Sequence, residues 1–292
     1  MPNLPERVTV PHLTARKRKG QPIVMVTAYD APQARFADAA GVDAILVGDS
    51  VGMTTLGYDT TLPVTLDDLV YHTRAVTRGQ AARAQGQCPD GAPLDAETAR
   101  GARHALVITD LPFGSYGATP EDGVRAAVRA ISEGGAQAVK VEGAGSTTLE
   151  TVRRLVDIGV PVMGHLGMTP QSVHRLGGFK VQGKTDAAAD AIVAAAETLT
   201  AAGVFGIVLE IIPGALAARV TKAVPVPTIG IGAGPHCDGQ VQVLHDLIGF
   251  VPGPPFKHAR RYTEAGAAIE AALVAYCADV RDHRFPTPDN AF

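Results

Sequence analysis

Tryptophan is absent from the sequence, and aromatic residues make up only 5% of it. So few aromatic rings argue against a surface on which nucleic-acid bases stack. The formal net charge at pH 7 is −3, so the chain also lacks the basic excess of polyanion-binding proteins. One short basic run, Arg16 to Lys19, is interpreted as the solvated end of a structural element. We therefore expect no nucleic-acid partner.

Cysteine is also scarce, and long apolar segments are missing. Cys88, Cys237 and Cys277 are odd in number and far apart, which argues against a disulfide framework and for a reducing compartment. Each is interpreted as a small buried side chain, because none stands beside an obvious base. The first residues lack the apolar core of a signal peptide, and no apolar run approaches the roughly 18–20 residues of a membrane span. The sequence predicts a soluble cytoplasmic protein without a membrane partner.

Short apolar runs rich in β-branched residues recur along the chain, each followed by a helical pattern. Continuous rather than alternating hydrophobicity is typical of strands in a parallel sheet, which is covered on both faces. Their alternation with helices predicts a single-domain (β/α)8 TIM barrel over residues 1–292, with its active site at the C-terminal ends of the strands. An open doubly wound sheet is the main alternative, but no G-x-G-x-x-G pattern follows the first run. The expected strands span 23–30, 44–50, 105–113, 138–143, 160–167, 206–210, 227–234 and, less clearly, 246–250.

Two helices between these strands have clear start and stop signals. Thr119 can cap a helix that begins at Pro120, and Thr185 or Asp186 can cap another that ends at Gly203. One segment, 77–104, breaks the alternation with small and polar residues and little periodicity. It predicts a surface insertion at about 81–103.

Acidic residues stand at the ends of several expected strands, and in a barrel those ends converge on one face. Asp30 follows the first strand and, taken alone, is interpreted as a helix cap. Asp49, Asp110, Glu142 and Glu210 end or follow the second, third, fourth and sixth strands. Converging acids without partners would repel one another and lose solvation, so this collection favours a functional site over a structural role.

A divalent cation would relieve that repulsion. Asp49, Asp110 and Glu142 offer only hard oxygen ligands, which favours Mg²⁺ or a similar cation with positions left for water or substrate. Lys140 is two residues before Glu142 and therefore points to the same side of the strand. It can receive an anionic oxygen of a substrate, or it can form a structural ion pair. His165 closes the fifth strand and can contact substrate or only orient its neighbours.

Glu210 stands between apolar neighbours, which suits a general acid or base near neutral pH; a salt-bridged carboxylate is the alternative. A metal, a lysine and a separate glutamate together suit a 2-oxo acid, whose enolate a metal stabilises after proton removal. Proton abstraction, aldol cleavage and carbon–carbon bond formation all remain open on spacing alone.

Several long motifs resemble the ketopantoate hydroxymethyltransferase family, the first committed enzymes of pantothenate synthesis, from about Val24 to Tyr262. The resemblance implies a (β/α)8 barrel that uses one Mg²⁺ per subunit and 5,10-methylenetetrahydrofolate. Such an enzyme adds a hydroxymethyl group to 3-methyl-2-oxobutanoate through a Mg-stabilised enolate and gives 2-dehydropantoate and tetrahydrofolate. The family also implies a homo-oligomer, a homodecamer in bacteria. The motifs are "TAYD", "VGDSVGMTTLGYDTTLPVTLDDLVYHTRAVTRG", "DLPFGSY", "VKVEG", "PVMGHLGMTPQSVHRLGGFKVQGK", "VLEIIP" and "IGIGAGPHCDGQVQVLHDLIG".

Matched motif by motif, the resemblance assigns roles to individual residues. Asp49 and Ser50 of "GDS" are expected on substrate, Asp49 also on the metal. Asp110 of "DLPF" and Lys140 of "VKVEG" are expected to bind substrate, with Asp110 and Glu142 on the metal. Glu210 of "VLE" corresponds to the family's proton acceptor. The list of expected site residues is thus Asp49, Ser50, Asp110, Lys140, Glu142 and Glu210, with His165 as a supporting residue.

The sequence departs from the family in two places. The insertion at about 81–103 is longer than usual, and Pro255 stands where the family usually carries lysine in a P-K-F motif, which bears on folate binding. Two alternative functions are another barrel enzyme and a non-catalytic binding protein. A metal-dependent 2-oxo acid lyase or mutase of the isocitrate-lyase type usually offers a reactive cysteine on a mobile loop, and no such motif is found. A non-catalytic oxo-acid-binding barrel would be favoured by loss of a carboxylate, but all are present.

Overall fold

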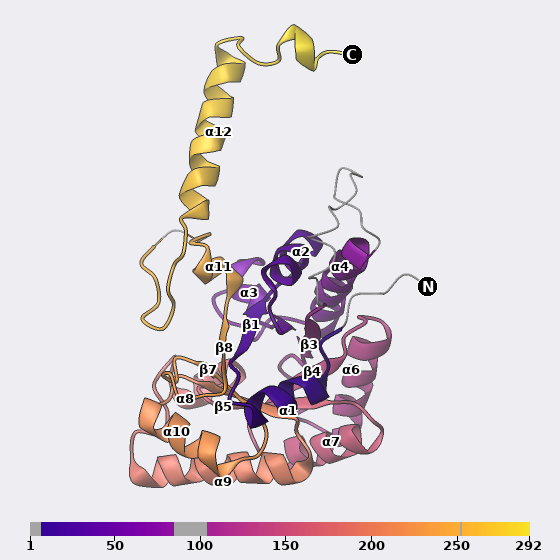
Figure 1. Cartoon of the computed structure of the whole chain (residues 1–292), viewed down its shortest axis with the longest axis vertical. Helices are drawn as coiled ribbons and strands as arrows, with labels where there is room; N and C mark the ends of the chain where they lie inside the picture. The colour runs from indigo at the N-terminus through magenta and orange to yellow at the C-terminus, as the bar shows by residue number, and fades with distance from the viewer. Residues whose placement is uncertain (1–6, 85–103, 252) are drawn as a thin grey trace. The chain divides into compact units, whose positions relative to one another are not determined.

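The computed structural model describes residues 7–84, 104–251 and 253–292. Its strands pair in parallel in sequence order, and β8 pairs with β1 to close the barrel (Figure 1). The TIM-barrel prediction is therefore confirmed. The strands are β1 Ile23–Thr27, β2 Ala44–Val47, β3 Leu106–Asp110, β4 Ala138–Glu142, β5 Val162–Gly167, β6 Gly206–Glu210, β7 Thr228–Ile231 and β8 Gly239–Gln242.

The prediction for the eighth strand was wrong. The apolar run 246–250 is not a strand; it overlaps the short helix α11, Leu244–Leu247. The strand that closes the barrel is instead β8, in which buried Gly239 and Val241 alternate with the less buried Gln240 and Gln242. Continuous hydrophobicity, which located the other strands, does not mark a strand with this alternating pattern.

Helices follow the strands around the outside of the barrel (Figure 1). The side chains between them and the strands form one large apolar cluster, which includes Leu149, Val152, Leu199, Leu209 and Val220. The helices of the first part of the chain are α1 Val10–Arg18, α2 Ala31–Ala40, α3 Val51–Thr54, α4 Leu66–Ala84, α6 Pro120–Ser132, α7 Ser146–Asp157, η1 Pro170–Ser172, α8 Val173–Leu176, α9 Asp186–Ala202 and α10 Gly214–Ala223.

The predicted helix ends are confirmed where capping residues marked them. Thr119 accepts a hydrogen bond from the backbone of Asp122 at the start of α6, and Thr185 caps α9 through the backbone of Ala188. Gly203 ends α9 in the left-handed conformation that glycine adopts easily. Asp30 caps α2 and is therefore the helix cap that the sequence suggested.

The N-terminal end of the barrel is covered by α1. Leu13 of this helix packs with the residues that fill the barrel interior, among them Ile23, Leu106 and Met163. Arg16 pairs with Asp43 at 2.7 Å, and Lys17 pairs with Asp238 at 2.7 Å. The basic run thus lies at a helix end as expected, but two of its members hold that helix on the barrel rather than being merely solvated.

Asp38 is a buried acid that contacts the described residues on both sides of the segment 85–103. Helix α4 continues to Ala84, so the chain is helical into the first residues of the 81–103 segment; the remainder, 85–103, lies outside the described residues. Asp38 accepts hydrogen bonds from Gln80 at 3.1 Å and from the backbone of Ala105 at 3.0 Å. His104 lies 2.8 Å from the same carboxylate. Asp38 therefore joins α4 to the residues that lead into β3.

The chain divides into two compact units, Met1–Gln242, which contains the barrel, and Val243–Phe292. The second unit contains α11, α12 Ala265–Arg281 and η2 Pro288–Asn290. The cysteine prediction was wrong for Cys277, which is exposed on α12, and only partly right for half-buried Cys237; both are free thiols, and Cys88 lies outside the described residues.

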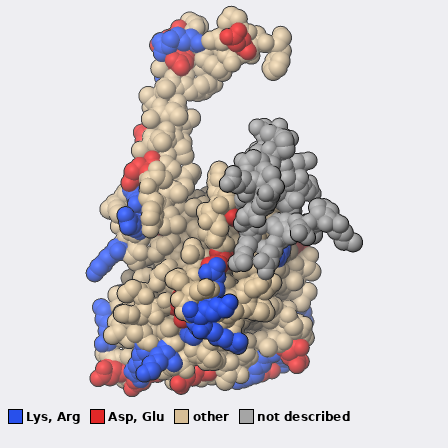
Figure 2. All heavy atoms as spheres, viewed as in Figure 1, with Lys and Arg blue, Asp and Glu red and all other residues tan. Residues whose placement is uncertain are grey.

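Charged side chains of both signs are spread over the visible face of the barrel unit, with uncharged residues between them (Figure 2). This mixture of signs agrees with the near-neutral composition. None of the helices that the structure describes is both long enough and apolar enough to cross a membrane.

Candidate active site

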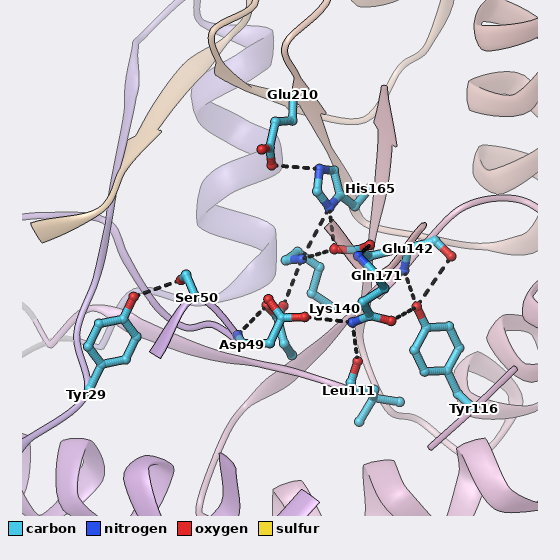
Figure 3. A network of polar contacts seen from close by, with 11 residues as sticks. Tyr29, Asp49, Ser50, Leu111, Tyr116, Lys140, Glu142, His165, Gln171 and Glu210 are labelled. Atoms are coloured by element: carbon cyan, nitrogen blue, oxygen red, sulfur yellow. Dashed lines mark hydrogen bonds and ion pairs between the residues drawn. The ribbon is translucent and has the colours of Figure 1, made fainter. Parts of the chain in front are cut away.

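The acids predicted from the strand ends lie together at the C-terminal end of the barrel (Figure 3). Asp110, Glu142 and Glu210 are the last residues of β3, β4 and β6, and Asp49 follows β2. Strand register places Asp110 beside Lys140 and Glu142 beside His165. Asp49, Asp110, Lys140, Glu142 and His165 are all buried.

Gly48 allows the first two acids to approach each other. The backbone N–H of Asp49 donates to Oδ2 of Asp110 at 3.0 Å. A side chain at position 48 would place its Cβ only 3.0 Å from Oγ of Ser50 and 3.2 Å from Oδ2 of Asp110. The space beside Gly48 is thus taken by the Asp110 carboxylate and the Ser50 hydroxyl.

Lys140 is the cation at the centre of the acidic residues. Its Nζ lies 2.9 Å from Oδ1 of Asp110 and 3.9 Å from Oε1 of Glu142. Burial lowers the pKa of Lys140, but Asp110, Glu142 and Asp49 together outweigh burial and raise that pKa above its usual range. Lys140 is therefore charged, and the ion pair and the substrate-binding role that its spacing allowed are compatible.

His165 connects two of the carboxylates. Its Nδ1 lies 3.2 Å from Oε1 of Glu142, and its Nε2 lies 3.2 Å from Oε2 of Glu210. Burial and nearby Lys140 lower the pKa of His165, but the two carboxylates outweigh them and raise it to about 9. At neutral pH the ring is therefore an imidazolium whose Nδ1 hydrogen-bonds to Glu142 and also lies 3.4 Å from Nζ of Lys140, while its Nε2 forms an ion pair with Glu210.

The pKa values of Asp49, Asp110 and Glu142 shift in different directions. Burial, Asp110 and Glu142 raise the pKa of Asp49 well above its usual value. Burial also raises the pKa of Asp110, although Lys140 opposes it. For Glu142 the effect of burial is outweighed by His165 and Lys140, and its pKa is lowered. Asp49 and Asp110 are therefore the acids whose ionised forms the surrounding side chains and burial disfavour.

The carboxylates of the site are suitable ligands for a divalent cation. Carboxylate oxygens are the ligands that Mg²⁺ prefers, and the excess of acids over Lys140 and His165 leaves charge for a cation to neutralise. In the described part of the chain, however, no three His, Cys, Asp or Glu side chains surround a single point as a closed metal cage would. The site therefore fits Mg²⁺ bound by one or two carboxylates, with water or substrate completing its coordination.

Ser50 begins the short helix α3, but its hydroxyl does not cap that helix. The Ser50 Oγ lies 2.8 Å from the hydroxyl of Tyr29, which follows β1. Burial raises the pKa of Tyr29 to about 12, so this phenol remains neutral and can hydrogen-bond to Ser50 in either direction. The carboxylate of the preceding residue, Asp49, accepts a hydrogen bond from Gln171.

The backbone around Glu210 is unusual. Ile211 has a φ of 46°, which is a rare conformation for a β-branched residue. Its N–H donates to Ile231, and its carbonyl accepts from Gln182. On the other side Gly167 allows close packing, since a Cβ there would lie 2.2 Å from the carbonyl oxygen of Glu210. Glu210 is therefore held between two backbone segments that fix its direction.

Three polar residues of the site were not predicted: Tyr29, Tyr116 and Gln171. Tyr116 accepts a hydrogen bond from the backbone of Glu142 at 2.9 Å, and its hydroxyl lies 2.8 Å from Oε1 of Gln171. All three lie in loops that follow β1, β3 and β5. Because βα loops build the active sites of barrels, their position just beyond the strand ends is the signal that could have found them.

The closed parallel barrel with acids, a lysine and a histidine at its C-terminal end defines a TIM-barrel enzyme. Solved structures with this fold include a phosphonopyruvate hydrolase complexed with oxalate and Mg²⁺ (TM-score 0.57, 12% identity, 96% of this chain and 92% of that one). Another is 2,3-dimethylmalate lyase, a member of the PEP mutase/isocitrate lyase superfamily (TM-score 0.54, 16% identity, 96% and 92%). At these identities the likeness concerns the fold alone.

Sequence comparison identifies the family within this fold. The ketopantoate hydroxymethyltransferase family matches residues 7–87 and 94–288. The 3-methyl-2-oxobutanoate hydroxymethyltransferase of Moorella thermoacetica is 49% identical over 286 residues, 98% of each chain. That of Thermosynechococcus vestitus is 49% identical over 280 residues, 96% of this chain and 98% of its own. The chain belongs to the ketopantoate hydroxymethyltransferase family and is an enzyme of that kind.

Proposed function

We propose that the enzyme transfers a hydroxymethyl group from 5,10-methylenetetrahydrofolate to 3-methyl-2-oxobutanoate, giving 2-dehydropantoate and tetrahydrofolate. This reaction would be its step in pantothenate synthesis, carried out in the cytoplasm by a homo-oligomer, as the family resemblance implies. The observation that carries the proposal is the placement of Glu210, which forms an ion pair with His165, opposite the acids around Lys140. It provides a separate base beside a site for an oxo acid.

Of the three acids that the sequence predicts as metal ligands, Asp49, Asp110 and Glu142, one or two would bind the Mg²⁺ directly. When bound, the cation would act as a Lewis acid that draws electron density from the oxo acid and makes its C3 proton easier to remove. Asp49 and Asp110 are the stronger candidates for direct ligands. Burial and neighbouring acids raise the pKa of each, and a bound cation would favour their ionised forms again. Glu142 is already satisfied by His165 and by the backbone of Gln171.

The chain's own residues bind and orient the oxo acid. Lys140 keeps its positive charge in the site and can receive an anionic oxygen of the substrate, while Ser50 can donate its hydroxyl proton to the substrate because Tyr29 can donate its own proton to the Ser50 oxygen. Burial of these groups strengthens each interaction, since little water competes for them. These contacts would fix the C3 hydrogen relative to Glu210.

Glu210 would then remove the C3 proton. The imidazolium of His165 orients the accepting carboxylate through Nε2 and is itself held by Glu142 through Nδ1. The enolate carbon attacks the one-carbon unit of the folate, and water releases the hydroxymethyl product and tetrahydrofolate. The proton taken by Glu210 leaves with the products or returns to solvent, which makes exchange at C3 a direct measure of this step.

The proposal is tested by incubating the purified protein with Mg²⁺, 3-methyl-2-oxobutanoate and 5,10-methylenetetrahydrofolate and measuring 2-dehydropantoate by mass spectrometry. We expect product that requires all three components and that disappears in EDTA. Absence of product across a range of pH and of divalent cations would contradict the proposed reaction.

A further inference from the structure

Gln171 hydrogen-bonds to four residues of the site, although it belongs to none of the strands (Figure 3). It lies in the short helix η1 that follows β5, where Pro170 starts the helical turn. Its side-chain Nε2 donates to Oδ2 of Asp49 at 2.9 Å and to the carbonyl of Leu111 at 3.0 Å. Its backbone N–H donates to Oε2 of Glu142 at 3.0 Å. One residue therefore links the C-terminal ends of β2, β3, β4 and β5.

The direction of each of these hydrogen bonds is fixed by its partners. The Tyr116 hydroxyl accepts the backbone N–H of Glu142, and its own proton goes to Oε1 of Gln171 at 2.8 Å, a closer acceptor than the Glu142 carbonyl at 3.5 Å. The amide nitrogen of Gln171 then faces the carboxylate of Asp49 and a backbone carbonyl, both of which only accept. A flipped amide would place Oε1 against these two acceptors. The network thus has a single arrangement.

We infer that Gln171 is a positioning residue for the metal site: it holds the Asp49 carboxylate by Oδ2, so that Oδ1 is the oxygen left to bind a cation. Without this hydrogen bond the carboxylate could rotate about its side chain. It would then have to be ordered when the cation binds, at a cost in affinity. The Glu142 carboxylate is held differently, by the backbone of Gln171 and by His165, and would keep its place when only the side chain of Gln171 changes.

The inference rests on the proposed function for the presence of a divalent cation, and its test separates the two. The variant Q171M removes the amide while keeping a side chain of similar length, and it leaves the backbone contact with Glu142 intact. Q182M is the matched control in the same loop, because the Gln182 side chain bonds only to the carbonyl of Lys180. The probe is Mn²⁺, titrated by calorimetry into the metal-free full-length protein without substrate.

Hydrogen bonds to charged groups shift an equilibrium constant by roughly tenfold to a hundredfold. We expect Q171M to weaken Mn²⁺ binding by about that factor and Q182M to bind as the wild type does. With Mg²⁺ and 3-methyl-2-oxobutanoate, Q171M should raise the KM for C3 proton exchange more than it lowers kcat, since Glu210 is not touched. Q171N, which keeps an amide but is too short to reach both Asp49 and Tyr116, should bind Mn²⁺ weakly like Q171M while keeping the polarity of the site.

Two results would overturn the inference. One is wild-type Mn²⁺ affinity in Q171M and Q171N. The other is equal weakening in Q182M, which would assign the effect to the loop as a whole rather than to the Gln171 amide. If the wild-type protein itself binds no Mn²⁺, the proposed metal site is contradicted, and this inference with it.

Discussion

The Nε2 atom of His165 lies 3.2 Å from Oε2 of Glu210, while the Nδ1 atom of the same ring lies 3.2 Å from Oε1 of Glu142. A single imidazolium therefore joins the proposed base to the carboxylates on the metal side. Both Glu142 and Glu210 raise the pKa of His165, so a change in the charge of either glutamate alters the protonation of this ring.

The raised pKa of His165 predicts how stability depends on pH. The ring gains protons in the folded state that it lacks when unfolded, so its contribution is fully present below about pH 6.5 and is lost as the pH rises through about 9. In EDTA, the free energy of unfolding of the wild type should fall relative to that of H165Q by on the order of 3 kcal/mol over this window. Urea unfolding at several pH values measures it. H174Q, which changes an exposed histidine of α8, should follow the wild type. A constant difference between wild type and H165Q would contradict the assignment.

Asp49 should limit stability in the absence of metal. Its raised pKa means that the folded state disfavours the ionised form, so the charge destabilises the protein at neutral pH. D49N should therefore increase the free energy of unfolding in EDTA by roughly 1 to 2 kcal/mol, and Mg²⁺ should no longer stabilise the variant. The exposed residue Asp59 provides the control D59N, which removes the same charge elsewhere. A less stable D49N, or one that Mg²⁺ still protects, would be inconsistent with this account.

Ile211 should matter for the rate more than for stability. A left-handed backbone costs a non-glycine residue about 1–2 kcal/mol, so I211G relieves strain while losing a half-buried side chain. We expect the free energy of unfolding to change by less than about 1 kcal/mol and kcat to fall several-fold, because glycine frees the direction of Glu210. I211N, whose side chain tolerates this conformation but restricts the backbone more than glycine, should retain more activity. The kcat for C3 proton exchange decides the matter, and an unchanged value in I211G would contradict it.

The strand ends were predictable because buried parallel strands have a continuous apolar pattern, and their charged termini stand out against it. Asp110, Glu142 and Glu210 were found in this way, and the closed barrel explains why they converge. The eighth strand escaped the same rule, since its residues alternate between more and less buried positions.

Gln171 and Tyr116 lie beyond the strand ends, in the βα loops, so the pattern of charged strand termini alone did not select them. They reach the site from loops, and their importance lies in hydrogen bonds that cross from one βα unit to another. Such contacts depend on how the loops fold over the barrel, and no periodicity in the sequence encodes them. The strained conformation of Ile211 is likewise set by the tertiary contacts of its backbone with Ile231 and Gln182.

The proposed base is tested most directly by proton exchange at C3 of 3-methyl-2-oxobutanoate, followed by NMR in deuterated buffer with Mg²⁺ and without folate. The wild type should exchange this proton. E210Q should not, while it still binds the oxo acid in a calorimetric titration. E197Q, which alters an exposed glutamate of α9, should exchange at the wild-type rate. Full exchange by E210Q would contradict the central claim that Glu210 removes the proton.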